Sequence, residues 1–115
     1  MEAAAFCANK VASVTVIGRS SVPFENTLGK EIGASIGKLF ESKGVTLIGN
    51  AAIEKFVGEN NIVIGVVANG ETIPADLCIV GLGVDYDTGF LKGTNIKTTA
   101  QGGVDVDEVS NFPYK

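Results

Sequence analysis

Ser13-Val14-Thr15-Val16-Ile17 is a short run of β-branched and apolar residues. Such a run is typical of a strand that is buried on both faces of a parallel sheet. A second run of the same kind, Val45-Thr46-Leu47-Ile48, lies further along the chain. Between them, apolar side chains recur at helical spacing over residues 28–43, at Leu28, Ile32, Ile36, Leu39 and Phe40. A strand, a helix and a second strand in this order predict a parallel α/β arrangement.

The residues around the central helix predict where it begins and ends. Thr27 is placed to cap its amino end, and Gly44 suits the left-handed position that ends a helix. Pro23 interrupts regular strand pairing, so residues 18–27 are expected to form a loop. Glycines recur at every fourth residue, at Gly29, Gly33 and Gly37. We expect them to let one face of the helix pack closely against a neighbour.

Further elements are predicted on both sides of this unit. Residues 3–8 favour a short helix. Three strands of an antiparallel meander are expected after the second parallel strand, at 51–57, 62–68 and 71–74. Gly58-Glu59-Asn60-Asn61 and Asn69-Gly70 supply the turns between them.

The last third of the chain begins with Asp76-Leu77-Cys78-Ile79-Val80, which is expected to form another buried strand. Beyond it, residues 85–93 predict an irregular or one-turn segment. Residues 96–98 and 104–106 are placed to pair with one another across two glycines.

The composition narrows the possible functions. The 115 residues are enough for one small domain but not for two independent cores. With 9 Lys and Arg against 13 Asp and Glu, the net charge is −4. An acidic chain with a single arginine lacks a basic patch for phosphate backbones, so nucleic acid is not an expected partner. No apolar run approaches the roughly 20 residues that span a membrane.

Metal and histidine chemistry are not expected either. The chain contains no histidine, which excludes Ser-His and Cys-His catalytic pairs and His-ligated metals. Cys7 and Cys78 form no Cys-x-x-Cys motif and are expected to be buried thiols. Asp105-Val106-Asp107-Glu108 lacks the spacing of a calcium loop. The first residues lack the basic start of a signal peptide, so we expect an intracellular location, cytoplasmic or mitochondrial.

The order of the segments resembles the NAD(P)H-binding domain of the FAD-dependent pyridine nucleotide (disulfide) oxidoreductases. Within that superfamily the chain is most similar to the apoptosis-inducing-factor-like and ferredoxin-reductase-like members. The resemblance covers essentially the whole chain through collinear stretches, which are Met1-Glu2-Ala3-Ala4-Ala5, Val14-Thr15-Val16-Ile17, Val22-Pro23-Phe24, Leu28-Gly29, Gly44-Val45-Thr46-Leu47, 75–84, Gly89-Phe90-Leu91 and Val104-Asp105-Val106-Asp107. It implies a partial Rossmann-like α/β fold with parallel strands and a three-stranded antiparallel meander.

The resemblance also shows what the chain lacks. In the family, a strand and a Gly-x-Gly-x-x-Gly turn precede the segment like Met1-Glu2-Ala3, and that turn holds the pyrophosphate of the dinucleotide. An Ala-x-Gly-Asp motif that holds FAD follows a stretch like Asn111-Phe112-Pro113, and it too is missing. Residues 1–115 are therefore expected to be a single truncated NAD(P)H-binding domain, without its first strand, glycine-rich turn and FAD-binding regions.

The implied ribose contacts lie in Gly18-Arg19-Ser20-Ser21, after the first predicted strand. NAD-preferring members usually carry an acid there, which accepts a hydrogen bond from the ribose 2′-hydroxyl. Here the Arg19 guanidinium would pair instead with a 2′-phosphate, and Ser20 and Ser21 would donate to it. This departure favours NADPH over NADH. An ordinary solvated loop arginine remains the alternative.

Two further stretches are implied to contact the nicotinamide end. Glu2 matches the family's acid after the glycine turn, and its carboxylate would accept a hydrogen bond from the carboxamide. Gly81-Leu82-Gly83 would let the backbone approach the ring closely. The structural alternatives are a solvated acid and a glycine turn.

The implied function is the NAD(P)H-binding segment of a flavin-dependent oxidoreductase that moves electrons from NAD(P)H through FAD to an acceptor. No residue is expected to act as an acid or base catalyst, and the isolated chain is expected to be inactive. The alternative is a non-enzymatic, truncated Rossmann-like interaction module. In the family the missing strand lies between the strands like 13–17 and 76–80. We therefore expect these two strands to pair directly, or the chain to self-associate through its unpaired edges.

Overall fold

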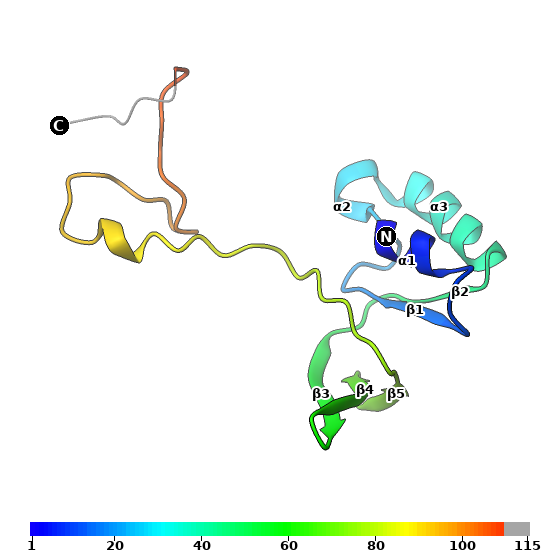
Figure 1. The fold of residues 1–115 in the computed structure, drawn as a ribbon. Coiled ribbons are helices and arrows are strands. Elements are labelled where there is room, and N and C mark those ends of the chain that lie inside the picture. Colours follow the sequence, from blue (N-terminus) through cyan, green and yellow to red (C-terminus); the bar gives the residue numbers. More distant parts are fainter. Residues whose placement is uncertain (110–115) are drawn as a thin grey trace. The chain divides into compact units, whose positions relative to one another are not determined.

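The computed structural model describes residues 1–109. The chain divides into two compact units, Met1–Ile79 and Val80–Lys115. Figure 1 shows that the first unit holds α1 to α3 and both sheets. The stretch Asn111-Phe112-Pro113, which precedes the family's FAD motif, lies outside the described residues.

A parallel pair of strands organises the first unit. β1 (Val14–Ile17) and β2 (Val45–Ile48) run in the same direction, with Val14 opposite Val45 and Ile17 opposite Ile48. α1 (Glu2–Cys7) precedes β1, and α3 (Lys30–Ser42) connects the two strands along the same face of the sheet (Figure 1). The predicted strand, helix and strand are confirmed. The predicted burial of both faces of these strands is wrong, because the side chains of Thr15 and Thr46 are exposed.

The start of the central helix differs from the prediction. A four-residue helix, α2 (Glu25–Leu28), forms within the expected loop, and Gly29 separates it from α3. Gly29 has a φ of 81°, which glycine adopts without the steric cost that a side chain would bring. Gly29, and not Thr27, is therefore the N-cap residue of the long helix. At the other end Gly44 has a φ of 80° and ends the helix as predicted.

The glycines of α3 form its closely packed face. Gly33 and Gly37 are buried, and a Cβ atom on Gly33 would meet the carbonyl oxygen of Pro23 and lie 2.7 Å from Val22 Cγ2. The predicted close packing is confirmed. The apolar stripe is only partly covered, because Ile32 and Leu39 remain 54% and 58% exposed.

The antiparallel meander forms as predicted, with small shifts in its ends. β3 (Ile53–Glu59), β4 (Ile62–Ala68) and β5 (Glu71–Pro74) pair in that order. Both central residues have a positive φ in the turns Asn60-Asn61 and Asn69-Gly70, as the hairpin turn of type I′ requires. The buried apolar residues among residues 1–109 are Ala4 on α1, Val45 on β2, Ala51 before β3, and Val66, Val67 and Ala68 on β4.

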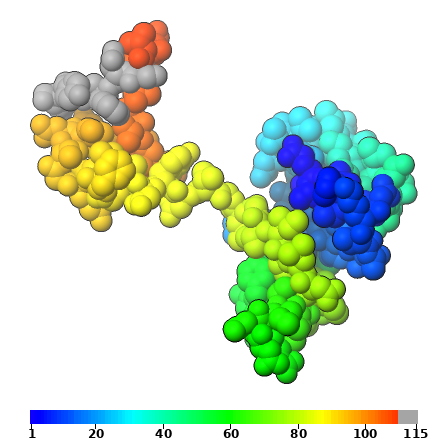
Figure 2. Space-filling model, in the orientation of Figure 1, coloured from blue at the N-terminus to red at the C-terminus, as the bar shows by residue number. Residues whose placement is uncertain are grey.

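The strand expected at 76–80 does not form. A strand needs a partner for its backbone N–H and C=O groups, and within the described residues β1 pairs only with β2. The expected pairing of 13–17 with 76–80 is therefore wrong as well. Apolar side chains along this stretch remain exposed, and they are Leu77, Ile79, Val80, Leu82 and Val84. Figure 2 shows the yellow part of this stretch as a single extended segment of chain. Cys7 and Cys78 are half-buried free thiols, not buried ones.

The second unit has little regular structure. Its one described helical turn, η1 (Gly89–Leu91), lies within the predicted irregular segment. The expected pairing of 96–98 with 104–106 is reduced to a single bridge between Thr98 and Val104. Over residues 1–109, no helix has both the length and the apolar character needed to cross a bilayer.

We predict that Gly33→Ala lowers the free energy of unfolding by about 1–3 kcal/mol, because the new methyl group must displace the backbone of Pro23. The matched control is Gly37→Ala, whose Cβ would lie 3.4 Å from Leu47 Cδ1, an ordinary contact distance. That variant gains helix propensity and should be unchanged or more stable by up to about 1 kcal/mol. Urea unfolding followed by circular dichroism measures both. Equal midpoints for Gly33→Ala and the unmodified chain would contradict the packing described.

Candidate functional site

The loops that follow β1 and β2 lie side by side at the carboxyl ends of the two strands. Gly18 N donates to Ile48 O at 2.9 Å, Ala51 N donates to Gly18 O at 2.9 Å, and Asn50 N donates to Ser20 O at 3.0 Å. Gly49 allows this approach, because a Cβ atom there would lie 2.6 Å from the carbonyl oxygen of Ser21. The carboxyl edge of a parallel sheet is where open α/β folds bind their ligands.

Arg19 places a positively charged guanidinium at the carboxyl edge of the parallel sheet. Its side chain is exposed, and within residues 1–109 it forms no ion pair and no side-chain hydrogen bond. The backbone on either side of Arg19 is fixed by the bonds of Gly18 and Ser20 to the neighbouring loop. The backbone of Arg19 is thus held at a fixed point of the edge, and the donors of its exposed guanidinium are available to an anion.

Ser21 already donates to a carboxylate. Its backbone N and its Oγ each lie 2.8 Å from Glu25 Oε2, and Val22 N lies 3.4 Å from the same oxygen. The Ser21 hydroxyl, then its backbone N–H, lower the pKa of Glu25 below its ordinary value, with smaller lowering by Val22 N–H and by the charge of Lys30. Desolvation opposes them. The hydroxyl that we expected to meet a 2′-phosphate is therefore engaged within the chain.

Glu25 was missed by the sequence analysis. Its spacing from Ser21 is one residue longer than in the capping box, in which Glu reaches back to a serine three residues before it. A capping-box pattern that allows one extra residue matches Ser21-Val22-Pro23-Phe24-Glu25, and this signal could have identified Glu25. Phe24 turns the chain so that Glu25 can reach back to Ser21. Its φ of 58° is a left-handed conformation that non-glycine residues seldom adopt.

The other predicted residues lie elsewhere. Glu2 begins α1 and is exposed, and the amino end of this helix lies toward the end of the sheet at which β1 finishes (Figure 1). Gly81-Leu82-Gly83 belongs to the second unit, where all three residues are exposed and Gly83 has a φ of 105°. The structure thus brings together residues 18–21 and adds Glu25 to them. No group of three or more metal-binding side chains exists within the described range.

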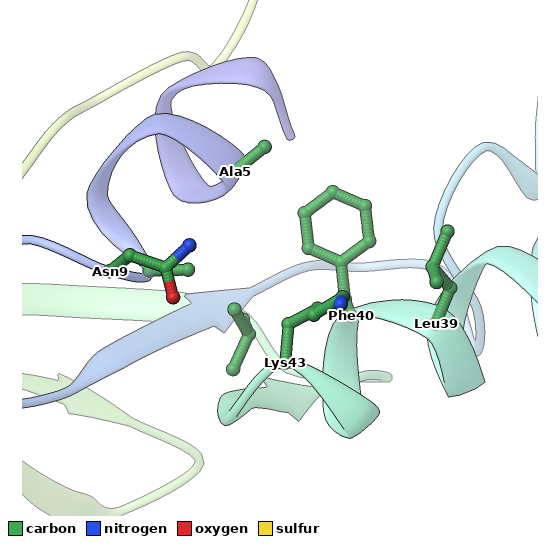
Figure 3. Close-up of a pocket in the computed structure, with 7 residues that line it drawn as sticks. Ala5, Asn9, Leu39, Phe40 and Lys43 are labelled. Atoms are coloured by element: carbon green, nitrogen blue, oxygen red, sulfur yellow. The ribbon is translucent and has the colours of Figure 1, made fainter.

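A pocket of about 260 Å³ lies at the opposite edge of the sheet, between α1, α3 and the first residue of β2 (Figure 3). Its lining is mostly apolar and consists of Ala5, Ala8, Asn9, Leu39, Phe40, Lys43 and Val45. None of the predicted contact residues lines it. Its position at the amino end of β2 separates it from the loops that carry Arg19 and Ser21.

Comparison with known sequences gives a consistent family assignment. A family model described as pyridine nucleotide-disulphide oxidoreductase matches residues 1–112. Apoptosis-inducing factor 3 of Homo sapiens is 30% identical over 116 residues, covering 98% of this chain and 19% of that protein. The Mus musculus protein is 28% identical over the same shares. The chain therefore spans about a fifth of the length of these curated relatives.

Solved structures show the same fold. A NAD-dependent persulfide reductase from A. fulgidus superposes with a TM-score of 0.78 and 25% identity, over 87% of this chain and 18% of that one. An HOCl-induced flavoprotein disulfide reductase of Escherichia coli gives a TM-score of 0.81 and 23% identity, over 98% and 26%. A ferredoxin reductase of Rhodopseudomonas palustris gives 0.77 and 24%, over 84% and 24%.

We predict that the Glu25 carboxyl titrates below an ordinary glutamate and that Ser21→Ala raises its pKa, because the largest stabilising hydrogen bond is lost. The bond to Ser21 contributes stability above the pKa of the unfolded chain, and this contribution is lost as the pH falls through the lower folded value. Carboxyl ¹³C shifts followed by NMR against pH measure the midpoint. Ser20→Ala is the control and should leave it in place. The same midpoint in Ser21→Ala would contradict the contact.

Proposed function

The chain belongs to the pyridine nucleotide-disulphide oxidoreductase family, and from this we propose that it is the NAD(P)H-binding segment of a flavin-dependent oxidoreductase. The family is FAD- and NAD(P)H-dependent. In this proposal FAD is held by parts of the enzyme beyond this segment and passes electrons to an acceptor. The observation that carries the proposal is the exposed Arg19 guanidinium, whose backbone is fixed at the carboxyl edge of a parallel sheet and which has no side-chain partner among residues 1–109.

The residues at this edge fit the adenosine ribose of a dinucleotide. Gly18 carries no side chain, and nothing lies within 4 Å of the position that a Cβ atom would take, so the backbone is open to a ligand. Arg19 would pair with a 2′-phosphate, and Ser20 would donate its hydroxyl. We propose NADPH as the preferred nucleotide on this ground. When bound, the nicotinamide supplies the hydride, and the role of this chain is to bind and orient it.

Glu2 and Gly81-Leu82-Gly83 are proposed as contacts to the nicotinamide end. The exposed Glu2 carboxylate would accept from the carboxamide, and the exposed glycine backbone would permit close approach of the ring. These residues act through hydrogen bonding and shape. We propose no acid or base catalyst in the chain, and we expect no turnover of NADPH without added flavin.

A second candidate, a non-enzymatic interaction module, is favoured by one observation. The stretch 77–84 exposes a series of apolar side chains, with Leu82 68% and Val84 82% exposed. Apolar residues of strand-like sequence with unpaired backbone groups recruit other strands. We propose that a second copy of this chain pairs along this stretch.

We predict that NADPH binds about tenfold more tightly than NADH, and that Arg19→Glu reverses this order. A charge-assisted contact to the 2′-phosphate contributes on the order of 1.5–3 kcal/mol, and a carboxylate would repel that phosphate and accept from a 2′-hydroxyl. Isothermal titration calorimetry with both nucleotides measures the preference.

The matched control is Lys43→Glu, which makes the same change of charge just beyond the far end of α3. It should leave the preference unchanged. Equal affinities for both nucleotides before and after Arg19→Glu would remove Arg19 from the site. If neither NADPH nor NADH binds, the proposed function itself is contradicted.

We predict that the chain sediments as a concentration-dependent mixture of monomer and dimer, and that Leu82→Glu shifts it toward monomer. A carboxylate on each copy would place like charges on the paired strands, and their repulsion is unfavourable. Ile62→Glu, at a residue with a similar exposed fraction of 64%, is the control and should not shift the distribution. A single monomeric species at all concentrations would contradict the interaction.

A further inference from the structure

The proposed ribose loop holds an anionic group of its own. Three donors converge on one oxygen, because Ser21 N and Ser21 Oγ lie 2.8 Å from Glu25 Oε2 and Val22 N lies 3.4 Å from it. Successive backbone N–H groups with a neighbouring hydroxyl are the kind of donor set that binds phosphate oxygens. The donors that a phosphate would use are thus filled by a carboxylate of the same chain.

This carboxylate comes from outside the predicted ribose contacts, which are residues 18–21. Glu25 is the first residue of α2, and the left-handed conformation of Phe24, with a φ of 58°, turns the chain so that residue 25 reaches back to residue 21. A non-glycine residue in this region has a conformational cost, which the surrounding contacts must offset. The hydrogen bonds to Glu25 are a direct source of that compensation.

We propose that Glu25 is a specificity-determining residue of the nucleotide site, whose carboxylate occupies the donors of Ser21 and Val22 and opposes a 2′-phosphate beside Arg19. The inference rests on the proposed function, which places the adenosine ribose at residues 18–21. It adds a residue that acts against Arg19. A 2′-phosphate meets only Arg19 and the Ser20 hydroxyl unless it displaces the carboxylate, while a 2′-hydroxyl needs no such displacement.

Glu25 could exclude the phosphate or only hold the loop in shape, and these two roles predict different nucleotide affinities. If the carboxylate only held the loop in shape, its loss would change the affinity for both nucleotides by the same factor. If it excludes the phosphate, its loss changes the affinity for NADPH alone. Glu25→Gln suits this comparison, because the amide keeps the size of the side chain and one oxygen acceptor but removes the charge.

The experiment is calorimetric titration of NADPH and NADH into the full chain and two variants. We expect Glu25→Gln to bind NADPH about tenfold more tightly and to bind NADH within about twofold of the unmodified chain. The matched control is Glu31→Gln, which removes a charge from the first turn of α3 and should change neither affinity. An equal change for both nucleotides, or no change, overturns the inference and leaves the proposed function standing. No binding to any form overturns both.

A second measurement needs no variant. We expect the Glu25 carboxyl ¹³C resonance of the unmodified chain to shift when 2′-AMP is added and to stay in place when 5′-AMP is added. The 2′-phosphate alone competes for the donors of residues 21 and 22. A resonance that shifts equally with both nucleotides, or with neither, overturns the inference.

Discussion

Backbone hydrogen bonds between the loops after β1 and β2 hold the candidate site in shape. Gly18, Ser20, Asn50 and Ala51 form them, and they are possible only because the parallel register places both strand ends at one edge. Gly49 is part of the same constraint, since any side chain there would meet the Ser20 and Ser21 carbonyls. Asn69 extends the linkage to the meander, because its amide contacts Asn50 O at 3.2 Å and Ala52 N at 3.3 Å.

Elements that depend on local signals were predictable from the sequence. β-branched runs gave β1 and β2, asparagine and glycine turns gave the meander, and the spacing of Gly33 and Gly37 gave the packed face of α3. The stretch 76–80 failed for the opposite reason. Its apolar sequence is that of a buried strand, but a strand forms only with a partner, and sequence pattern does not reveal whether one is present.

The site divides in the same way. Residues 18–21 could be placed at the carboxyl edge of the sheet because they follow a recognisable strand. Glu25 had only a weak signal, because its spacing from Ser21 is one residue longer than in a capping box and its reach depends on the left-handed conformation of Phe24, which composition does not predict. Thr27 was wrongly predicted as the N-cap residue of the long helix for a related reason. It has the chemistry of a cap, but the positive φ of Gly29 decides where α3 begins.

In the proposed site, Arg19 and Glu25 would act on the same phosphate by different physical means. Arg19 is exposed, so its attraction is screened by salt and its side chain must be ordered when a ligand binds. Glu25 is already ordered by its hydrogen bonds to Ser21 and Val22, so a ligand that needs those donors must break existing bonds. Raising the salt concentration should therefore weaken the contribution of Arg19 more than that of Glu25. The nucleotide preference of such a loop depends on which donors are free as much as on the charge of the residue that follows the strand.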